Sequence, residues 1–452
     1  MKKEENLFKL FLKYAVPSIS AMWFFSIYTM IDGIFVGRGV GSQALAAVNL
    51  SMPFINTIFA VALLVAVGSS TLITYYFGKG KDHYSNNIFT LNFIILSLLG
   101  VTITLFTLLF LEEVALFLGA TEETLPLVMD YLKIITIFST FFMVAYSLEV
   151  LVKADGFPFL SIVVVIIAAI VNIFLDYLLV IRLDFGVKGA AIATGASQLI
   201  SFMIFLSYFL WGNSRLKFIK PEINWSCIKD IFIIGGPESL TELSAGFTIF
   251  IFNFSISRVI GAEGLAAFGV IMYLNNLVIM TMIGINQGIQ PLISYFNGKN
   301  ETEKISKLLS LALKTGMVFS ALFFLSSQFL TEQLVSLFID TGEIEVFTLS
   351  AVGLEKFSFG FLLCSFNIIL SGYFTALRKT KKAMIISLSR GYIVVALSLI
   401  IMPAFLGEVG IWMSPLLYES LTLLLAGTIF WRYQKKDKVT KKNKSTATAY
   451  RV

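Results

Sequence analysis

An amide and a carboxylate stand one helical turn apart in the largely apolar stretch IVNIFLDYLLV, residues 170–180, as Asn172 and Asp176. Residues four apart lie on the same face of a helix, so both side chains point in the same direction. A charge at the centre of a bilayer costs about 3 kcal/mol on insertion scales, and such residues usually face a cavity or the interior of a bundle. The pair is therefore a candidate for binding a cation.

Two more polar residues are expected at a similar depth: Asp32 in the first apolar stretch and Thr194 near the start of the sixth. We predict that Asp32, Asn172, Asp176 and Thr194 converge as a cation-coupling site. Oxygen ligands of these types suit Na⁺, whereas two carboxylates that lie close together repel and can hold a proton instead. Two alternatives stay open: the aspartates face the outer interface, and Thr194 bonds to its own helix backbone.

A different polar set occurs in the second half of the chain. Glu238 and Glu242 are four residues apart in GGPESLTELSAGF and share a helix face. We predict a substrate-binding set of Glu242, Asn275, Asn276, Gln287, Gln290 and Glu419. For Glu238 and Glu419 the alternative is a hydrogen bond between helices.

The elements that must position these residues are membrane helices. The 452 residues are 57% hydrophobic and only 14% charged, with a mean hydropathy of +0.85, whereas a soluble protein carries about 25% charged residues. Charge-free runs such as 39–78 and 84–111 are long enough to span a bilayer. They are continuously apolar, which excludes the alternating pattern of a β-barrel.

We therefore predict an all-α polytopic membrane protein with twelve transmembrane helices. They lie near residues 14–36, 47–77, 88–111, 126–152, 158–181, 187–210, 229–257, 265–295, 311–330, 350–376, 384–405 and 410–431. Basic residues gather in alternate connections, such as LRKTKK at 377–382, and acidic ones in the others, such as LEEVALFLGATEE at 111–123. Because Lys and Arg favour the cytoplasmic side, both termini are expected there.

The chain repeats itself at an offset of 220 residues. Pro17 aligns with Pro237, and the pair Gly78-Lys79 aligns with Gly298-Lys299. Two parallel six-helix bundles are therefore predicted, related by an axis along the membrane normal. The expected division is an N-terminal bundle at 1–210, a cytoplasmic linker at 211–228, a C-terminal bundle at 229–432 and a basic cytoplasmic tail at 433–452.

Three segments together resemble one family, the multidrug and toxic compound extrusion (MATE) transporters, most closely the bacterial MepA-like branch. They are MIDGIFVGRGVGSQALAAVNLSMPF, VNIFLDYLLV followed by GVKGAAIAT, and INQGIQPLISYFNGK. The resemblance implies an efflux antiporter of the bacterial inner membrane, driven by H⁺ or Na⁺. It also implies that Asp32, Asn172, Asp176 and Thr194 form the cation site, and that they act as metal ligands if Na⁺ is the coupling ion.

In other branches an acidic residue on the seventh span pairs with an aspartate on the tenth. Here the tenth span, FSFGFLLCSFNIILSGYF, has no acidic residue. The comparison with those branches therefore favours the N-terminal bundle as the coupling site.

The expected function is secondary active efflux of lipophilic, cationic drugs by alternating access. The 44 Phe and 14 Met could supply cavity walls that suit such cations. A lipid-linked saccharide flippase of related fold is the alternative, disfavoured because the charges expected in the cleft are acidic. A channel is disfavoured because no filter-like loop occurs. No catalytic motif, cofactor or nucleic-acid site is indicated, so we expect a monomer whose partners are a drug and the lipid bilayer.

Overall fold

The computed structural model describes residues 6–339 and 344–449, and the secondary structure within them is helical. The first lobe, here called the N-lobe, contains α1 (Leu7–Gly39), α2 (Ser42–Gly78), α3 (Asp82–Leu109), the short α4 (Leu111–Phe117), α5 (Leu125–Asp155), α6 (Pro158–Asp176) with a π-helical extension η1 (Tyr177–Arg182), and α7 (Gly186–Trp211).

The second lobe, the C-lobe, follows the same plan. It contains α8 (Trp225–Val259), α9 (Ala262–Gly298), α10 (Thr302–Phe329), the short α11 (Thr331–Ser336), α12 (Ile344–Phe357), η2 (Ser358–Gly360), α13 (Phe361–Ala376), α14 (Thr380–Leu388), a π-helical η3 (Ser389–Ile393), and α15 (Val394–Ala449). The helices α12, η2 and α13 form one continuous span, Ile344–Ala376.

Between the last two predicted spans the chain reverses direction at Gly407. This residue has φ 54° and ψ −133°, a backbone conformation that lies outside the helical region. Ser414 Oγ lies 3.5 Å from the carbonyl oxygen of Ser398, although sixteen residues of straight helix would separate them by about 24 Å. The eleven apolar helical segments therefore supply twelve membrane-spanning helices in two six-helix bundles, as the sequence predicted.

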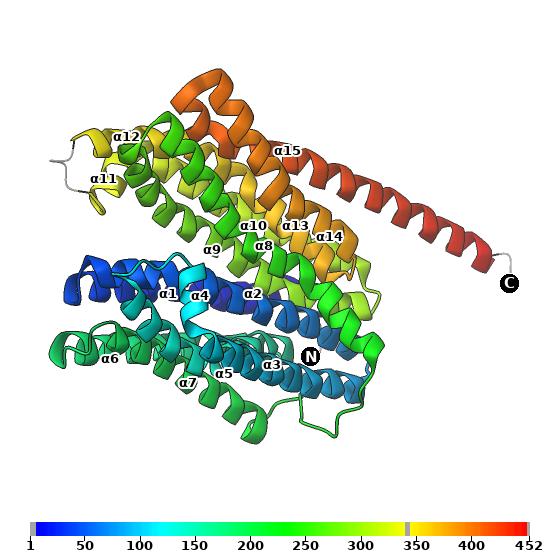
Figure 1. Cartoon of the computed structure of the whole chain (residues 1–452). Helices are drawn as coiled ribbons and strands as arrows, with labels where there is room; N and C mark the ends of the chain where they lie inside the picture. Colours follow the sequence, from blue (N-terminus) through cyan, green and yellow to red (C-terminus); the bar gives the residue numbers. More distant parts are fainter. Residues whose placement is uncertain (1–5, 340–343, 450–452) are drawn as a thin grey trace.

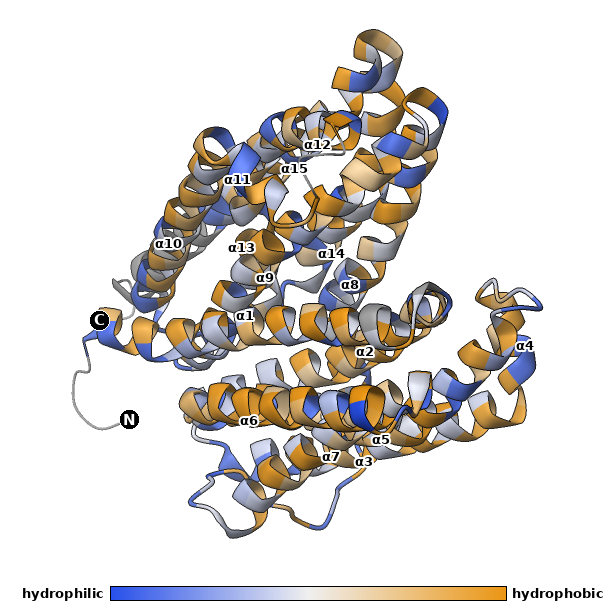
Figure 2. Cartoon of the chain, turned by 90° about the vertical axis from the view of Figure 1, so that its left-hand side faces the viewer, coloured by the Kyte–Doolittle hydropathy of each residue, from blue (hydrophilic) through white to orange (hydrophobic). Residues whose placement is uncertain are grey.

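The helices of both lobes are hydrophobic along most of their length (Figure 2). Large hydrophobic side chains are exposed there, among them Phe174, Ile400 and Phe405. Such a surface would be unstable in water, and it matches the hydrocarbon core of a bilayer. The chain is thus a multi-pass membrane protein.

The two lobes meet along α1 and α2 on one side and α8 and α9 on the other (Figure 1). We call the end of the molecule where α1 and α8 begin the base, and the opposite end the rim. Gly68 of α2 lies on the backbone of α8, and Gly235 of α8 lies on the backbone of α2. The repeat-related pair Gly78 and Gly298 also brings the ends of α2 and α9 together at the base.

These contacts lie in the base half of the molecule. Among the described residues, the hydrogen bond between the lobes that lies nearest the rim joins Asn276 Nδ2 to Ser26 Oγ, at 3.1 Å and close to mid-depth. Beyond that point the helices of the two lobes diverge toward the rim (Figure 1). The structure is therefore closed at the base and separated at the rim.

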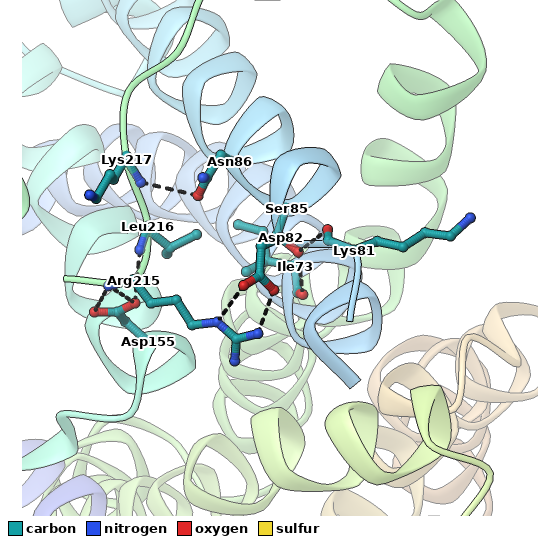
Figure 3. Close-up of polar contacts among 9 residues, drawn as sticks. All are labelled: Ile73, Lys81, Asp82, Ser85, Asn86, Asp155, Arg215, Leu216 and Lys217. Carbon is teal, nitrogen blue, oxygen red and sulfur yellow. Dashed lines mark hydrogen bonds and ion pairs between the residues drawn. The ribbon is translucent and has the colours of Figure 1, made fainter. Parts of the chain in front are cut away.

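The segment that joins the lobes, residues 212–224, is fixed to the N-lobe (Figure 3). The carboxylate of Asp155 accepts the backbone N–H groups of Arg215 and Leu216 at 3.0 and 3.1 Å, and the hydroxyl of Tyr208 at 2.6 Å. The guanidinium of Arg215 is ion-paired with Asp82. The linker therefore belongs to the N-lobe, where Glu222 N also donates to Asn87 Oδ1 at 2.8 Å, and α8 begins at Trp225.

Candidate functional site

Asp32 on α1 and Asp176 at the end of α6 lie close together in the interior of the N-lobe. Their carboxyl groups are near enough for direct electrostatic interaction, and Asp32 is 8% exposed while Asp176 is fully buried. Asn172 is also fully buried. Oδ1 of Asp32, both carboxylate oxygens of Asp176 and both amide atoms of Asn172 have no hydrogen-bond partner among the described residues.

Buried polar atoms are almost always paired in folded proteins, because an unpaired one keeps its full desolvation cost. The unpaired oxygen atoms of Asp32, Asn172 and Asp176 therefore form a candidate binding site, here called the seat, for a small cation or for a proton shared by the carboxylates. Within the described part of the chain there is no group of three or more His, Cys, Asp and Glu that could hold a metal ion. The seat contains two carboxylates and one amide.

Thr194 is half-buried on α7 and lines the same cavity as Asp32, which we call the N-lobe cavity. Its wall also includes Tyr131, Ile135 and Phe138 of α5. Tyr131 is within electrostatic range of both aspartates. The structure therefore brings three of the four predicted residues into one cluster, with Thr194 across the adjoining cavity.

A π-helical turn follows Asp176 directly, from Tyr177 to Arg182. A second π-helical turn, Ser389–Ile393, occurs in the C-lobe and contains Arg390. Single π turns inside α-helices are rare and are found mostly at functional sites. Each lobe thus carries one beside a buried charged group.

A second cavity, the central cavity, lies between the lobes at mid-depth. Its walls carry Phe25, Tyr28, Phe59, Phe142, Phe205, Met22 and Met280. The predicted residues Glu242, Gln287 and Gln290 line it, and so does Glu238. Aromatic faces with two carboxylates favour an organic cation.

Glu238 is held by two amide donors from α9. Its Oε1 accepts Gln290 Nε2 at 2.8 Å and Asn286 Nδ2 at 3.4 Å. The predicted alternative for Glu238, a hydrogen bond between helices, is therefore present, although the residue also lines the cavity. Glu242 lines the same cavity one turn along α8.

Three residues of the predicted substrate set are not on the cavity wall. Asn276 bonds to Ser26 at the contact between the lobes, and the amide of Asn275 lies 3.9 Å from Met272 Sδ. Glu419 is 1% exposed and forms an ion pair with Arg390, with 2.7 Å between Nη2 and Oε1. Asn367 adds a donor to the other Glu419 carboxylate oxygen at 2.6 Å.

The sequence indicated that the charges of the cleft are acidic. This prediction is wrong in part, because the basic residue Arg390 lines the central cavity. A second basic residue was also missed: Lys153, which is 1% exposed and lies 2.9 Å from Glu149. The i,i+4 spacing of Glu149 and Lys153 was visible in the sequence. Both residues, however, fall at a helix end, where charges usually face water.

The N-lobe cavity and the central cavity share one wall. Phe25, Tyr28, Phe142 and Gln198 line both. The Gln198 amide lies 3.4 Å from the Tyr28 hydroxyl. A substrate in the central cavity is therefore separated from Asp32 by a single layer of side chains.

Comparison with known proteins agrees with this architecture. The family model described as MatE matches twice, at residues 17–178 and 237–400, and the starts of the two matches are 220 residues apart. The multidrug export protein MepA of Staphylococcus aureus (strain NCTC 8325 / PS 47) is 28% identical over 448 residues, covering 97% of this chain and 96% of MepA. MepA of strain MSSA476 is 27% identical over 444 residues, with the same coverage.

Two solved structures have the same fold. The crystal structure of MATE in complex with MaL6 superposes with a TM-score of 0.91 at 21% identity, covering 97% of this chain and 98% of that one. The outward-facing conformation of a multidrug resistance MATE family transporter of the MOP superfamily gives 0.90 at 21% identity, covering 97% and 100%. The similarity extends across both lobes.

Proposed function

This chain belongs to the MatE family, and from that premise we propose that it is a secondary active multidrug efflux antiporter. It exports lipophilic organic cations in exchange for H⁺ or Na⁺ by alternating access between its two lobes. It works as a monomer, because one chain supplies both lobes and the cavity between them. Its base and both termini face the cytoplasm of a bacterial cell, in agreement with the distribution of basic residues.

The observation that carries this proposal is the unpaired oxygen cluster of Asp32, Asn172 and Asp176. A cation bound there neutralises two carboxylates that otherwise repel each other in a low-dielectric interior. Since Asp32 lies one side-chain layer from the central cavity, filling the seat changes the shape and charge of the drug site. Thr194, on the wall of the adjoining N-lobe cavity, offers a further oxygen to the ion.

Drug recognition is assigned to the central cavity. Glu242 supplies the negative charge, Gln287 and Gln290 supply amide groups, and the aromatic wall supplies contact area. A ligand shifts a conformational equilibrium only by its differential affinity for the two states. Exchange follows if the coupling ion prefers the state open at the rim and the drug prefers the state open at the base.

The relatives support this proposal, because MepA is a multidrug export protein. A lipid-linked saccharide flippase is the second candidate, and Arg390 on the cavity wall is the observation that favours it. The ion pair with Glu419 cancels much of the Arg390 charge, whereas Glu238 and Glu242 have no cationic partner among the described residues. The drug exporter is therefore preferred.

The substrate assignment is tested with purified protein in liposomes that hold a drug cation such as ethidium. Glu242→Gln should reduce transport of the cation while leaving transport of a neutral dye of similar size unchanged. Glu222→Gln, which changes an exposed carboxylate on the linker, is the control and should transport both. Equal loss of both substrates in Glu242→Gln would contradict the assignment.

A further inference from the structure

The buried ammonium of Lys153 lies behind the wall of the central cavity and is bonded to two residues of that wall. Lys153 Nζ lies 2.9 Å from Glu149 Oε1 and donates to Gln287 Oε1 at 2.8 Å. Glu149 and Gln287 both line the central cavity. A positive nitrogen that donates to a carboxylate and to an amide oxygen makes the same contacts that a protonated drug amine would make there.

These contacts cross from one lobe to the other. Lys153 and Glu149 are on α5 of the N-lobe, whereas Gln287 is on α9 of the C-lobe. Gln287 Nε2 also donates to the hydroxyl of Tyr146 on α5 at 3.2 Å. One amide therefore bonds to two residues of the opposite lobe.

The position of Gln287 depends on closure of the base. Its neighbours Gly284 and Gly288 lie directly on α1, where an added Cβ would be 2.7 Å from Ile19 Cα and 2.8 Å from Ala15 Cα. With no side chain between them, these backbones hold α9 against the N-lobe. If the base opens, α9 moves away from α1 and Lys153 loses the Gln287 oxygen.

We propose that Lys153 is a built-in competitor of the cationic drug. In the state closed at the base, its ammonium is bonded to Glu149 and Gln287, so these groups cannot bind the drug and the affinity of the cavity for the drug is lower. When the base opens, the Gln287 oxygen is free of Lys153 and the cavity accepts a drug cation. Lys153 thereby makes the affinity for the drug lower in the state closed at the base than in the state open at the base, which an exporter requires. This inference rests on the proposed function.

Lys153 is a positioning residue in this scheme, and a purely structural role predicts a different result. Loss of a structural buried ion pair weakens the fold and weakens binding. Loss of a competitor strengthens drug binding in the closed-base state, because Gln287 and Glu149 become available. The two roles therefore predict binding changes of opposite sign.

The experiment measures equilibrium binding of ethidium by fluorescence polarisation to the full-length protein in detergent. Lys153→Met and Lys153→Gln are compared with Lys188→Met, which removes an exposed lysine from an ion pair with Asp130. Both Lys153 variants should bind ethidium about tenfold more tightly, the effect of one charge-assisted hydrogen bond, and should export it more slowly. Lys188→Met should match the wild type.

A second measurement follows the base directly. Ser294 is fully buried, and its hydroxyl donates to the Thr71 carbonyl oxygen across the base at 2.6 Å. Ser294→Cys, in a background where Cys227 and Cys364 are replaced by Ala, should react faster with a maleimide when Lys153→Gln is added, because one bond between the lobes is lost.

The inference is overturned if the Lys153 variants bind ethidium as weakly as the wild type, or more weakly. Lys153→Gln keeps a donor for Glu149 and serves if Lys153→Met does not reach the membrane. If the wild type binds no organic cation and drives no exchange, the proposed function fails. Separately, if Lys153→Gln does not change the rate of cysteine labelling, Lys153 is not a contact that holds the base closed.

Discussion

The carboxyl groups of Asp32 and Asp176 face each other in the interior of the N-lobe, although the two residues lie on the first and fifth membrane-spanning helices. Neither faces lipid, since the exposed fractions are 8% and 0%. Two charges in such a place are costly unless a cation or a proton accompanies them. This relationship is the physical basis for assigning ion coupling to the N-lobe.

The first prediction concerns this pair. Asp32→Asn and Asp176→Asn should each abolish drug resistance in cells while the protein still reaches the membrane, because one neutral amide removes the charge that holds the ion. Resistance is measured by growth in ethidium, and expression by immunoblot of membranes. Asp184→Asn is the matched control, since Asp184 has φ +52°, a conformation that asparagine readily adopts. Wild-type resistance in both variants would reject the site.

The second prediction concerns the contact between the lobes at the base. In Gly235→Ala the new Cβ would collide with the Leu64 carbonyl oxygen, so α8 and α2 must move apart. Overpacking of this kind costs about 1–3 kcal/mol, and transport should fall together with the melting temperature in detergent. Gly246→Ala on the same helix meets no atom within 4 Å and should leave both unchanged. Normal transport by Gly235→Ala would show that the base tolerates separation there.

The third prediction concerns Arg390 and Glu419. Arg390→Met leaves the carboxylate of Glu419 buried without its cation, which should cost about 3–5 kcal/mol of folding free energy. Adding Glu419→Gln removes the unpaired charge and should restore much of the melting temperature, measured by differential scanning fluorimetry in detergent. If the double variant is no more stable than Arg390→Met, the ion pair does not explain the loss.

The fourth prediction concerns the linker. Asp155→Ala removes the acceptor for Tyr208 and for two linker backbone N–H groups, so the linker should detach from the end of α5. Limited proteolysis should then cut the linker several times faster than in the wild type. Asp130→Ala, which changes an exposed carboxylate, should give the wild-type rate. An unchanged rate in Asp155→Ala would mean that the contacts with α3, such as Arg215 with Asp82 and Glu222 with Asn87, hold the segment without Asp155.

Much of the fold could be predicted from sequence because the bilayer imposes simple rules. Long apolar runs specify spans, and the repeat at offset 220 specifies two equivalent bundles; both predictions are confirmed, including the turn near residue 407. The N-lobe residues could be proposed because a buried carboxylate is unusual in a membrane helix. The structure then brings Asp32 and Asp176 together, and their role remains a proposal.

The contents of the central cavity could not be predicted in the same way. Which amides point inward depends on helix rotation, so Gln287 lies on the cavity wall whereas Asn276 faces α1. Lys153 and Arg390 could not be recognised beside the cavity, because their partners Gln287 and Glu419 lie on other helices. The π turn that carries Arg390 has no recognisable sequence signal.

The most direct test of ion coupling is ethidium efflux from proteoliposomes under an imposed gradient of H⁺ or Na⁺, with the wild type and Asp32→Asn side by side. One of the two gradients should drive uphill efflux by the wild type, whereas Asp32→Asn should bind ethidium but show no gradient-driven movement. Uphill transport by Asp32→Asn at the wild-type rate, or wild-type transport indifferent to both gradients, would contradict this prediction.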